Sequence, residues 1–320
     1  MATLRDPTLA VRPGAEAGVD AGPVAGRRRG RNPLRSEAKW GVIYALPAVA
    51  VLAVFVIYPF ASIIVHAFTR WDGFTDPTFI GLRNFQFLFQ DQTFIGALRN
   101  NIYFALSVPI QLTLPLGLAF LIHQRIRGWR LFRWTYFLPA IYSTVVLGVL
   151  ARLVLQVDGP LNQVLGDIGL GGLGRDWLGD ASTALPSILT IFVWANFGYN
   201  VVLFLAGMSS IDPQLPEAAR IDGASQFQVL RHVFVPGLRR VMEIVLVTST
   251  INAFAYMFTY VFTITNGGPG FSTFVVEFDI YNNAFAFQKL GYACAMGLAI
   301  TVLISGLGFL QIRALNGGRE

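Results

Sequence analysis

The sequence has few charged residues, three histidines and a single cysteine. Only 13% of its 320 residues are charged, whereas an ordinary soluble domain has about 25%. A soluble fold of this length would need more polar side chains to cover its surface, so an ordinary globular protein is excluded. One cysteine excludes an intramolecular disulfide. Because the histidines lack a recognisable ligand spacing, we expect no metal site.

The motifs of common catalytic sites are also missing. The sequence contains no Gly-x-x-x-x-Gly-Lys-Ser/Thr phosphate-binding loop, so we do not expect this chain to bind ATP. No Ser/His/Asp set and no inward-facing carboxylate pair stands out. We therefore expect no catalytic residue, no cofactor and no enzyme activity in this chain.

What the sequence has instead is long apolar segments. Hydrophobic residues make up 54% of the chain, and they gather in six runs of about 19–27 residues. About 20 helical residues cross the hydrocarbon core of a membrane, and continuously apolar runs favour helices over barrel strands. The sequence therefore predicts an all-α, polytopic membrane protein. Its six transmembrane helices are expected near residues 42–68, 101–122, 134–155, 184–208, 241–263 and 292–310.

The net charge of +6 is distributed unevenly between the two sides of these spans. With the N-terminus inside, inner segments carry 18 lysines and arginines and outer segments carry five. This bias places both termini in the cytoplasm and is a topology signal, so we expect no nucleic-acid partner. Residues 1–38, rich in Ala, Gly, Pro and Arg, are predicted to be a disordered cytoplasmic tail. Residues 39–313 form the membrane domain, and 314–320 form a short C-terminal tail.

The fourth loop, residues 209–240, is the most informative segment. It contains Glu217-Ala-Ala, then three residues, Gly223, nine residues and Val233-Phe-Val-Pro236. Its pattern predicts two short amphipathic helices around a flexible turn, although an ordinary connecting loop remains the alternative on physical grounds alone.

This spacing resembles the EAA motif of bacterial ABC importer membrane subunits. The usual ending is Ile-x-Leu-Pro, so Val233 and Val235 are mild, apolar departures. In that family the loop carries a coupling helix that docks into a cleft of a cytoplasmic ATPase, so we call residues 209–240 the coupling loop. The resemblance implies that Glu217 and the turn at Gly223 transmit the ATPase stroke. The contact would be formed by Glu217, Ala218, Ala219, Asp222 and Gly223.

Further segments resemble the carbohydrate branch, which includes the maltose, glycerol-phosphate and disaccharide permeases. They are Gly81-Leu-Arg-Asn-Phe85, Phe132-Arg133 followed by Leu138-Pro139, and Thr265-Asn-Gly-Gly-Pro269. The resemblance implies a sugar permease of the bacterial inner membrane that forms half of a translocation pathway by alternating access. Its implied partners are the lipid bilayer, a second homologous permease, two ATPase subunits that bind ATP and Mg, and an extracytoplasmic sugar-binding protein.

Polar residues inside the spans are candidates for the substrate path. Asn252, Tyr256 and Tyr260 recur at i, i+4 and i+8, which predicts one shared helical face. Asn196 and Asn200 form a second polar cluster on the fourth span. Amides and aromatic rings suit sugar hydroxyls and C–H surfaces, but interhelical hydrogen bonding is the alternative interpretation of these residues.

Two other classes of function stay open at this point. A secondary transporter would need carboxylates embedded in the membrane, and the predicted spans offer only Glu243, at a cytoplasmic edge. A membrane-bound enzyme would require activity in the isolated chain.

Overall fold

The computed structural model describes residues 44–124, 136 and 138–316, with the backbone alone at 315 and 316. The predicted tail, the inner-loop arginines of 125–133 and residues 317–320 lie outside this part. The chain divides into two units, Met1–Ile57 and Tyr58–Glu320.

The described chain is helical apart from one small hairpin, which confirms the predicted all-α class. Strands β1 (Thr69–Arg70) and β2 (Thr78–Phe79) pair antiparallel, with Thr69 opposite Phe79. The helices up to residue 209 are η1 Ala53–Ile57, α2 Tyr58–His66, α3 Arg83–Leu88, α4 Gln92–Ala105, α5 Val108–His123, α7 Thr144–Leu155, α8 Pro160–Asp167, η2 Gly171–Leu173 and α9 Ala181–Ser209. The later helices are α10 Gln214–Ile221, α11 Gln226–Val229, η3 Leu230–Phe234, α12 Val235–Gly237, α13 Arg239–Ala255, α14 Phe258–Ile264, α15 Val276–Tyr281, η4 Asn282–Ala286 and α16 Leu290–Asn316.

Four helical segments of the described chain are long and apolar enough to cross a membrane. They are Tyr44–His66, Gln92–His123, Ala181–Ser209 and Leu290–Ala314. Two bent helix pairs, α7 with α8 and α13 with α14, raise the number to six if each pair is one span. The six-span count and the cytoplasmic placement of the termini stay predictions.

Two predicted spans are interrupted at places that the sequence analysis did not identify. In the third, residues 138–141 are helical, and α7 begins separately at Thr144, where the Ser143 side chain accepts a hydrogen bond from the Val145 amide at 3.3 Å. The chain then bends by 42° into α8. In the fifth, α13 ends at Ala255 and α14 leaves it at 49°. Apolar composition gives the length of a span but does not place these breaks.

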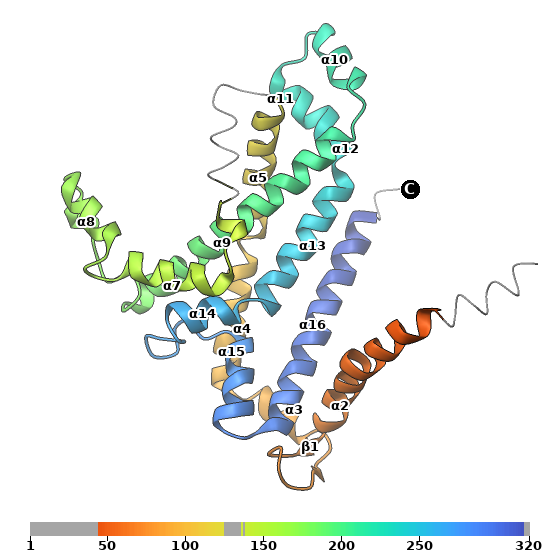
Figure 1. Ribbon diagram of the computed structural model, residues 1–320, viewed down its shortest axis with the longest axis vertical. Coiled ribbons are helices and arrows are strands. Elements are labelled where there is room, and N and C mark those ends of the chain that lie inside the picture. The colour runs from red at the N-terminus through yellow and green to blue at the C-terminus, as the bar shows by residue number, and fades with distance from the viewer. Residues whose placement is uncertain (1–43, 125–135, 137, 317–320) are drawn as a thin grey trace, which may run out of the picture. The chain divides into compact units, whose positions relative to one another are not determined.

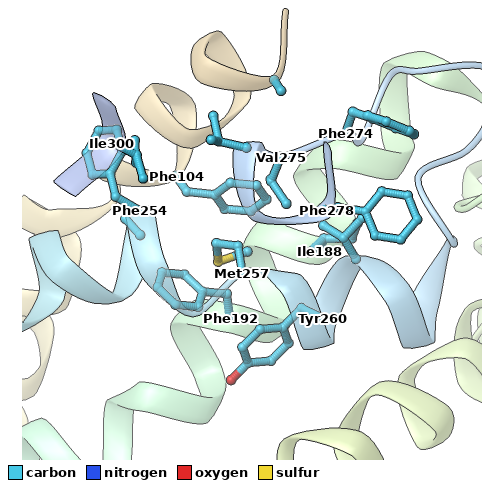
Figure 2. Close-up of a cluster of buried hydrophobic side chains, with 14 of the residues drawn as sticks. Phe104, Ile188, Phe192, Phe254, Met257, Tyr260, Phe274, Val275, Phe278 and Ile300 are labelled. Carbon is cyan, nitrogen blue, oxygen red and sulfur yellow. The ribbon is translucent and has the colours of Figure 1, made fainter. Parts of the chain in front are cut away.

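Two apolar clusters hold the unit Tyr58–Glu320 together. The larger one gathers side chains from α4, α9, α13, α14, α15 and α16. Figure 2 shows Met257 among aromatic side chains that include Phe104 and Phe192. The smaller cluster joins α5 and α9 to the coupling loop. Both clusters join residues from distant parts of the sequence, and van der Waals packing between their side chains stabilises the bundle.

The two ends of this unit carry different structures. Figure 1 shows α10 and α11 at one end and β1 with α3 at the other. At the β1 end, the Asn84 amide donates to the carbonyls of Ala67 and Thr69, at 2.9 Å each. The Gly291 amide donates to the Trp71 carbonyl at 3.0 Å. The motif around Asn84 therefore fastens the hairpin, which is a structural role.

Candidate functional site

The coupling loop forms the two short helices that the sequence predicted. Helix α10 ends in a turn in which the Gly223 amide donates to the Arg220 carbonyl at 3.1 Å, and the Ala224 amide donates to Ala219 at 2.9 Å. This pair of bonds is a Schellman motif, which needs a residue with positive φ at its centre. Gly223 supplies it, with φ of +83°. The glycine therefore ends α10 and redirects the chain toward α11.

Side-chain capping starts the second helix. The Ser225 hydroxyl accepts from the Gln228 amide at 3.4 Å, and the Gln228 side chain accepts from the Ser225 amide at 2.7 Å. This capping box satisfies two amides at a helix start. The helix continues as η3, where buried Phe234 packs edge-on against Phe120 and His123 of α5. The Val233-Phe-Val-Pro236 end of the motif thus anchors the loop on the second span.

The outward surface of this loop is partly apolar. Glu217 is exposed and takes part in no ion pair among the residues that the structure describes. Leu215, Ile221 and Phe227 are 57%, 86% and 68% exposed. The sequence interpretation missed these three residues, although large apolar side chains on an otherwise polar loop are a usable signal for a binding surface.

Two hollows flank α10. One, with a volume of about 280 Å³, lies between the two helices and is lined by the predicted contact residues Ala219, Asp222 and Gly223 among others. A second, of about 530 Å³, is lined by Glu217 and Arg220 on α10 and by His123 at the end of α5. The predicted contact residues therefore lie together, but Glu217 and Gly223 border different hollows.

The predicted polar face on the fifth span is not one continuous helical face, because the helix breaks within it. Asn252 lies on α13 and donates to the Asn196 side chain on α9 at 3.3 Å. Tyr256 lies at the break and is 65% exposed. Tyr260, on α14, is only 6% exposed and packs edge-on against Phe192 in the core. The Tyr260 side chain nevertheless interacts with Asn196, the residue that Asn252 contacts.

The second polar cluster also divides. Asn200 is buried, and its amide donates to the Gln111 backbone carbonyl on α5 at 3.2 Å. The buried Gln111 side chain donates to the Ser107 hydroxyl at 2.9 Å. Asn200 thus serves helix packing in this structure. Of the two asparagines, only Asn196 has a side-chain hydrogen bond to the fifth span.

Two carboxyl groups on α15 went unrecognised in the sequence. Burial raises the pKa of Glu277 to about 7, although its oxygens accept hydrogen bonds. Burial and the nearby Asp91 carboxylate raise the pKa of Asp279 to about 7 as well. Asp91 itself accepts from the Tyr292 hydroxyl at 2.8 Å. Acidic residues in the apolar run 274–281 were the available signal. In the described residues, no group of three or more His, Cys, Asp or Glu side chains is placed to hold a metal ion.

A third hollow, of about 640 Å³, lies at the hairpin end. Its lining mixes charges and aromatic rings, including Arg83, Asp76, Trp71 and Tyr292. The neighbouring Asp72 carboxylate accepts from the backbone and hydroxyl of Thr75 and from the Phe74 amide, which lowers its pKa to about 2.

Comparison with known proteins places these features in a family. Residues 88–316 match the family described as "Binding-protein-dependent transport system inner membrane component". The chain is 34% identical over 312 residues to the diacetylchitobiose uptake system permease protein NgcF of Streptomyces coelicolor, covering 92% of this chain and 88% of the relative. It is 33% identical over 278 residues to the lactose transport system permease protein LacF of Rhizobium radiobacter, covering 86% and 93%.

A solved structure has the same fold. A chain from a bacterial ABC transporter involved in the import of the acidic polysaccharide alginate matches with a TM-score of 0.76 and 23% identity. The match covers 89% of this chain and 99% of that one. The family match spans well over half of the sequence, and both relatives align over most of their length. The chain therefore belongs to the family of binding-protein-dependent transport system inner membrane components.

Proposed function

We propose that this chain is one membrane-spanning permease subunit of an ATP-binding-cassette importer for saccharides. It forms half of the translocation path together with a second, homologous permease. Two ATPase subunits bind ATP and Mg and act on the coupling loop, while an extracytoplasmic binding protein delivers the sugar. The named substrates of the two relatives, diacetylchitobiose and lactose, favour an oligosaccharide as cargo.

The observation that carries this proposal is the geometry of the coupling loop. A Schellman turn at Gly223 holds α10 and α11 in a fixed relation, and the loop presents Glu217 beside exposed Leu215, Ile221 and Phe227. Exposed apolar side chains beside exposed charges are suited to docking in a complementary cleft of another protein. The anchoring of Phe234 on α5 then connects a push on the loop to the second span.

The path itself is proposed to pass the Asn196–Asn252 contact and Tyr256. Asn252 donates to Asn196, yet both amides are only partly buried. The exposed ring of Tyr256 lies one helical turn further along. Amide groups and an aromatic face in this arrangement could bind sugar hydroxyls and C–H surfaces. Asn200 and Tyr260, also predicted from the sequence, would support the path by packing.

The test is substrate-stimulated ATP hydrolysis and uptake by the complex co-purified with its partners and reconstituted in liposomes. We expect ATP-dependent uptake of an oligosaccharide, identified by mass spectrometry of the bound sugar. We propose that a cationic group of the ATPase pairs with Glu217 on docking. Glu217→Gln should then weaken docking by more than tenfold, because breaking a buried interfacial charge pair costs about 2–5 kcal/mol. Arg231→Gln, which changes an exposed charge on the same loop, is the control. Uptake driven by an ion gradient without an ATPase would refute the proposal and favour a secondary transporter.

A further inference from the structure

The break in the fifth span replaces one backbone hydrogen bond by two side-chain bonds. In an unbroken α-helix the Met257 amide would donate to the Ala253 carbonyl, four residues earlier. Here the Met257 amide donates to Oε1 of Glu277 at 3.2 Å. The Ala253 carbonyl accepts instead from Nδ2 of Asn101 at 2.9 Å. Both backbone groups of this one broken bond therefore have a partner from another helix.

These two side chains also bind each other. Nδ2 of Asn101 donates to Oε2 of Glu277 at 3.1 Å, and Oδ1 of Asn101 accepts from the Val276 amide at 2.9 Å. The Asn101–Glu277 pair thus completes a chain of hydrogen bonds from one side of the break to the other. A side chain inserted into the helical ladder is a recognised cause of a sharp kink.

The polarity of this network is fixed by the backbone. The Asn101 amide group has its oxygen on an N–H donor and its nitrogen on a carbonyl, so a flipped amide would lose both bonds. Position 277 must then accept two hydrogen bonds, one from Asn101 and one from Met257. A carboxylate does so with its two oxygens, whereas a glutamine has one oxygen and would turn an N–H group toward a donor.

The backbone groups that face each other across the break are fully buried. Asn101, Ala253 and Met257 are each 0% exposed. In Figure 2, Met257 lies among the large apolar side chains of the core. A donor that loses its acceptor at this place stays unsatisfied, which is costly in a buried environment.

The bend decides what the outer half of the fifth span does. At its apex Tyr256 is 65% exposed, one turn beyond the Asn252–Asn196 contact. Beyond the apex, α14 packs along α7, where Gly148 leaves room for the Thr263 side chain. We propose that Glu277, oriented by Asn101, is a positioning residue for transport that holds α14 at its angle and so keeps Tyr256 on the substrate path. Its effect on transport rests on the proposed function, while its effect on the break does not.

The experiment compares Glu277→Gln with a double variant that combines Glu277→Gln and Asn101→Asp. In the double variant, the carboxylate introduced at position 101 accepts from the side-chain amide introduced at position 277 and still accepts from Val276. The amide oxygen at position 277 accepts from Met257. The swapped pair restores the contact with reversed polarity, and only the donor to Ala253 is lost. All variants are purified with their partner subunits, and size-exclusion chromatography checks their assembly.

Two readouts decide the outcome. Hydrogen–deuterium exchange at the Met257 amide, followed by mass spectrometry in lipid nanodiscs, should be about tenfold faster or more in Glu277→Gln, because a buried hydrogen bond is lost. It should return most of the way to the wild-type rate in the double variant. The maximal uptake rate should fall in the single variant and recover in the double one, with KM little changed. Exchange at Met257 that stays at the wild-type rate in Glu277→Gln, or a double variant no better than the single, would overturn the proposal.

Asp279→Asn is the matched control. It makes the same carboxylate-to-amide change two residues further along α15, where the side chain accepts from Asn283 and does not touch the break. Exchange at Met257 should be unaffected, and a rise equal to that of Glu277→Gln would refute a specific role of Glu277. Failure of the wild-type complex to take up any saccharide would count against the proposed function, and the exchange measurement would still decide the role of Glu277 at the break.

Discussion

Substitution of Gly223 separates backbone geometry from side-chain contact in the coupling loop. The residue has φ of +83°, and an added Cβ would meet no heavy atom within 4 Å. A larger residue therefore fits in space, and the cost of Gly223→Ala comes only from the left-handed backbone. Asparagine tolerates this conformation better than alanine does. The two substitutions add side chains to the same open space but differ in backbone preference.

The magnitude follows from the Schellman turn. A non-glycine residue in the left-handed region costs about 1–2 kcal/mol. That cost lowers the population of the docked loop conformation by a factor of roughly 5 to 30. The hydrogen bonds from Gly223 to Arg220 and from Ala224 to Ala219 would be the first to open. We expect Gly223→Ala to lose most of its coupling and Gly223→Asn to keep most of it.

The assay is saccharide-stimulated ATP hydrolysis by the reconstituted complex, with basal hydrolysis and subunit assembly measured in parallel. Gly223→Ala should assemble and keep basal hydrolysis, while stimulation by sugar falls severalfold. Equal stimulation in the alanine and asparagine variants would show that the sign of φ at Gly223 is not what matters. Wild-type coupling in both would refute the reasoning that this turn directs the docking helix.

Three further predictions follow from other parts of the structure. Gly291→Ala should lower the melting temperature, because its methyl group would overlap the backbone of β1 and overpacking costs about 1–3 kcal/mol; Gly297→Ala, with open space in the same helix, should be neutral in the same thermal scan. Burial raises the pKa of Asp279 from 3.8 to about 7, so the stability that its protonated form contributes is complete below about pH 4 and is lost as the pH rises to about 7. Asp279→Asn should therefore reduce the pH dependence of the melting temperature over this range. Single cysteines at Gly172 and Arg231, with the native cysteine replaced, should react with an impermeant thiol reagent from opposite sides of the membrane, and labelling from one side would refute the six-span topology.

Much of this protein could be predicted from local sequence signals. The long apolar runs indicate membrane helices because the thickness of the hydrocarbon core sets their length. The turn of the coupling loop was predictable because the bonds that close it join residues at most five positions apart, around a glycine that tolerates positive φ. The exposure of Ile221 and Phe227 follows from the same local helices.

Only the tertiary structure decided where the spans break and which polar residues meet. The fifth span bends because Asn101 bonds Ala253 across 152 positions of sequence and Glu277 bonds Met257 from a later helix. The sequence of α13 and α14 contains no signal of these distant partners. Helical spacing alone therefore predicted Tyr260 on a shared polar face, whereas its side chain is buried in the core. A buried carboxylate in a short apolar helix likewise has meaning only once the unsatisfied backbone amide beside it is known. Which side chains complete the hydrogen bonds of a distant helix depends on how the helices pack, and that packing depends on the whole bundle.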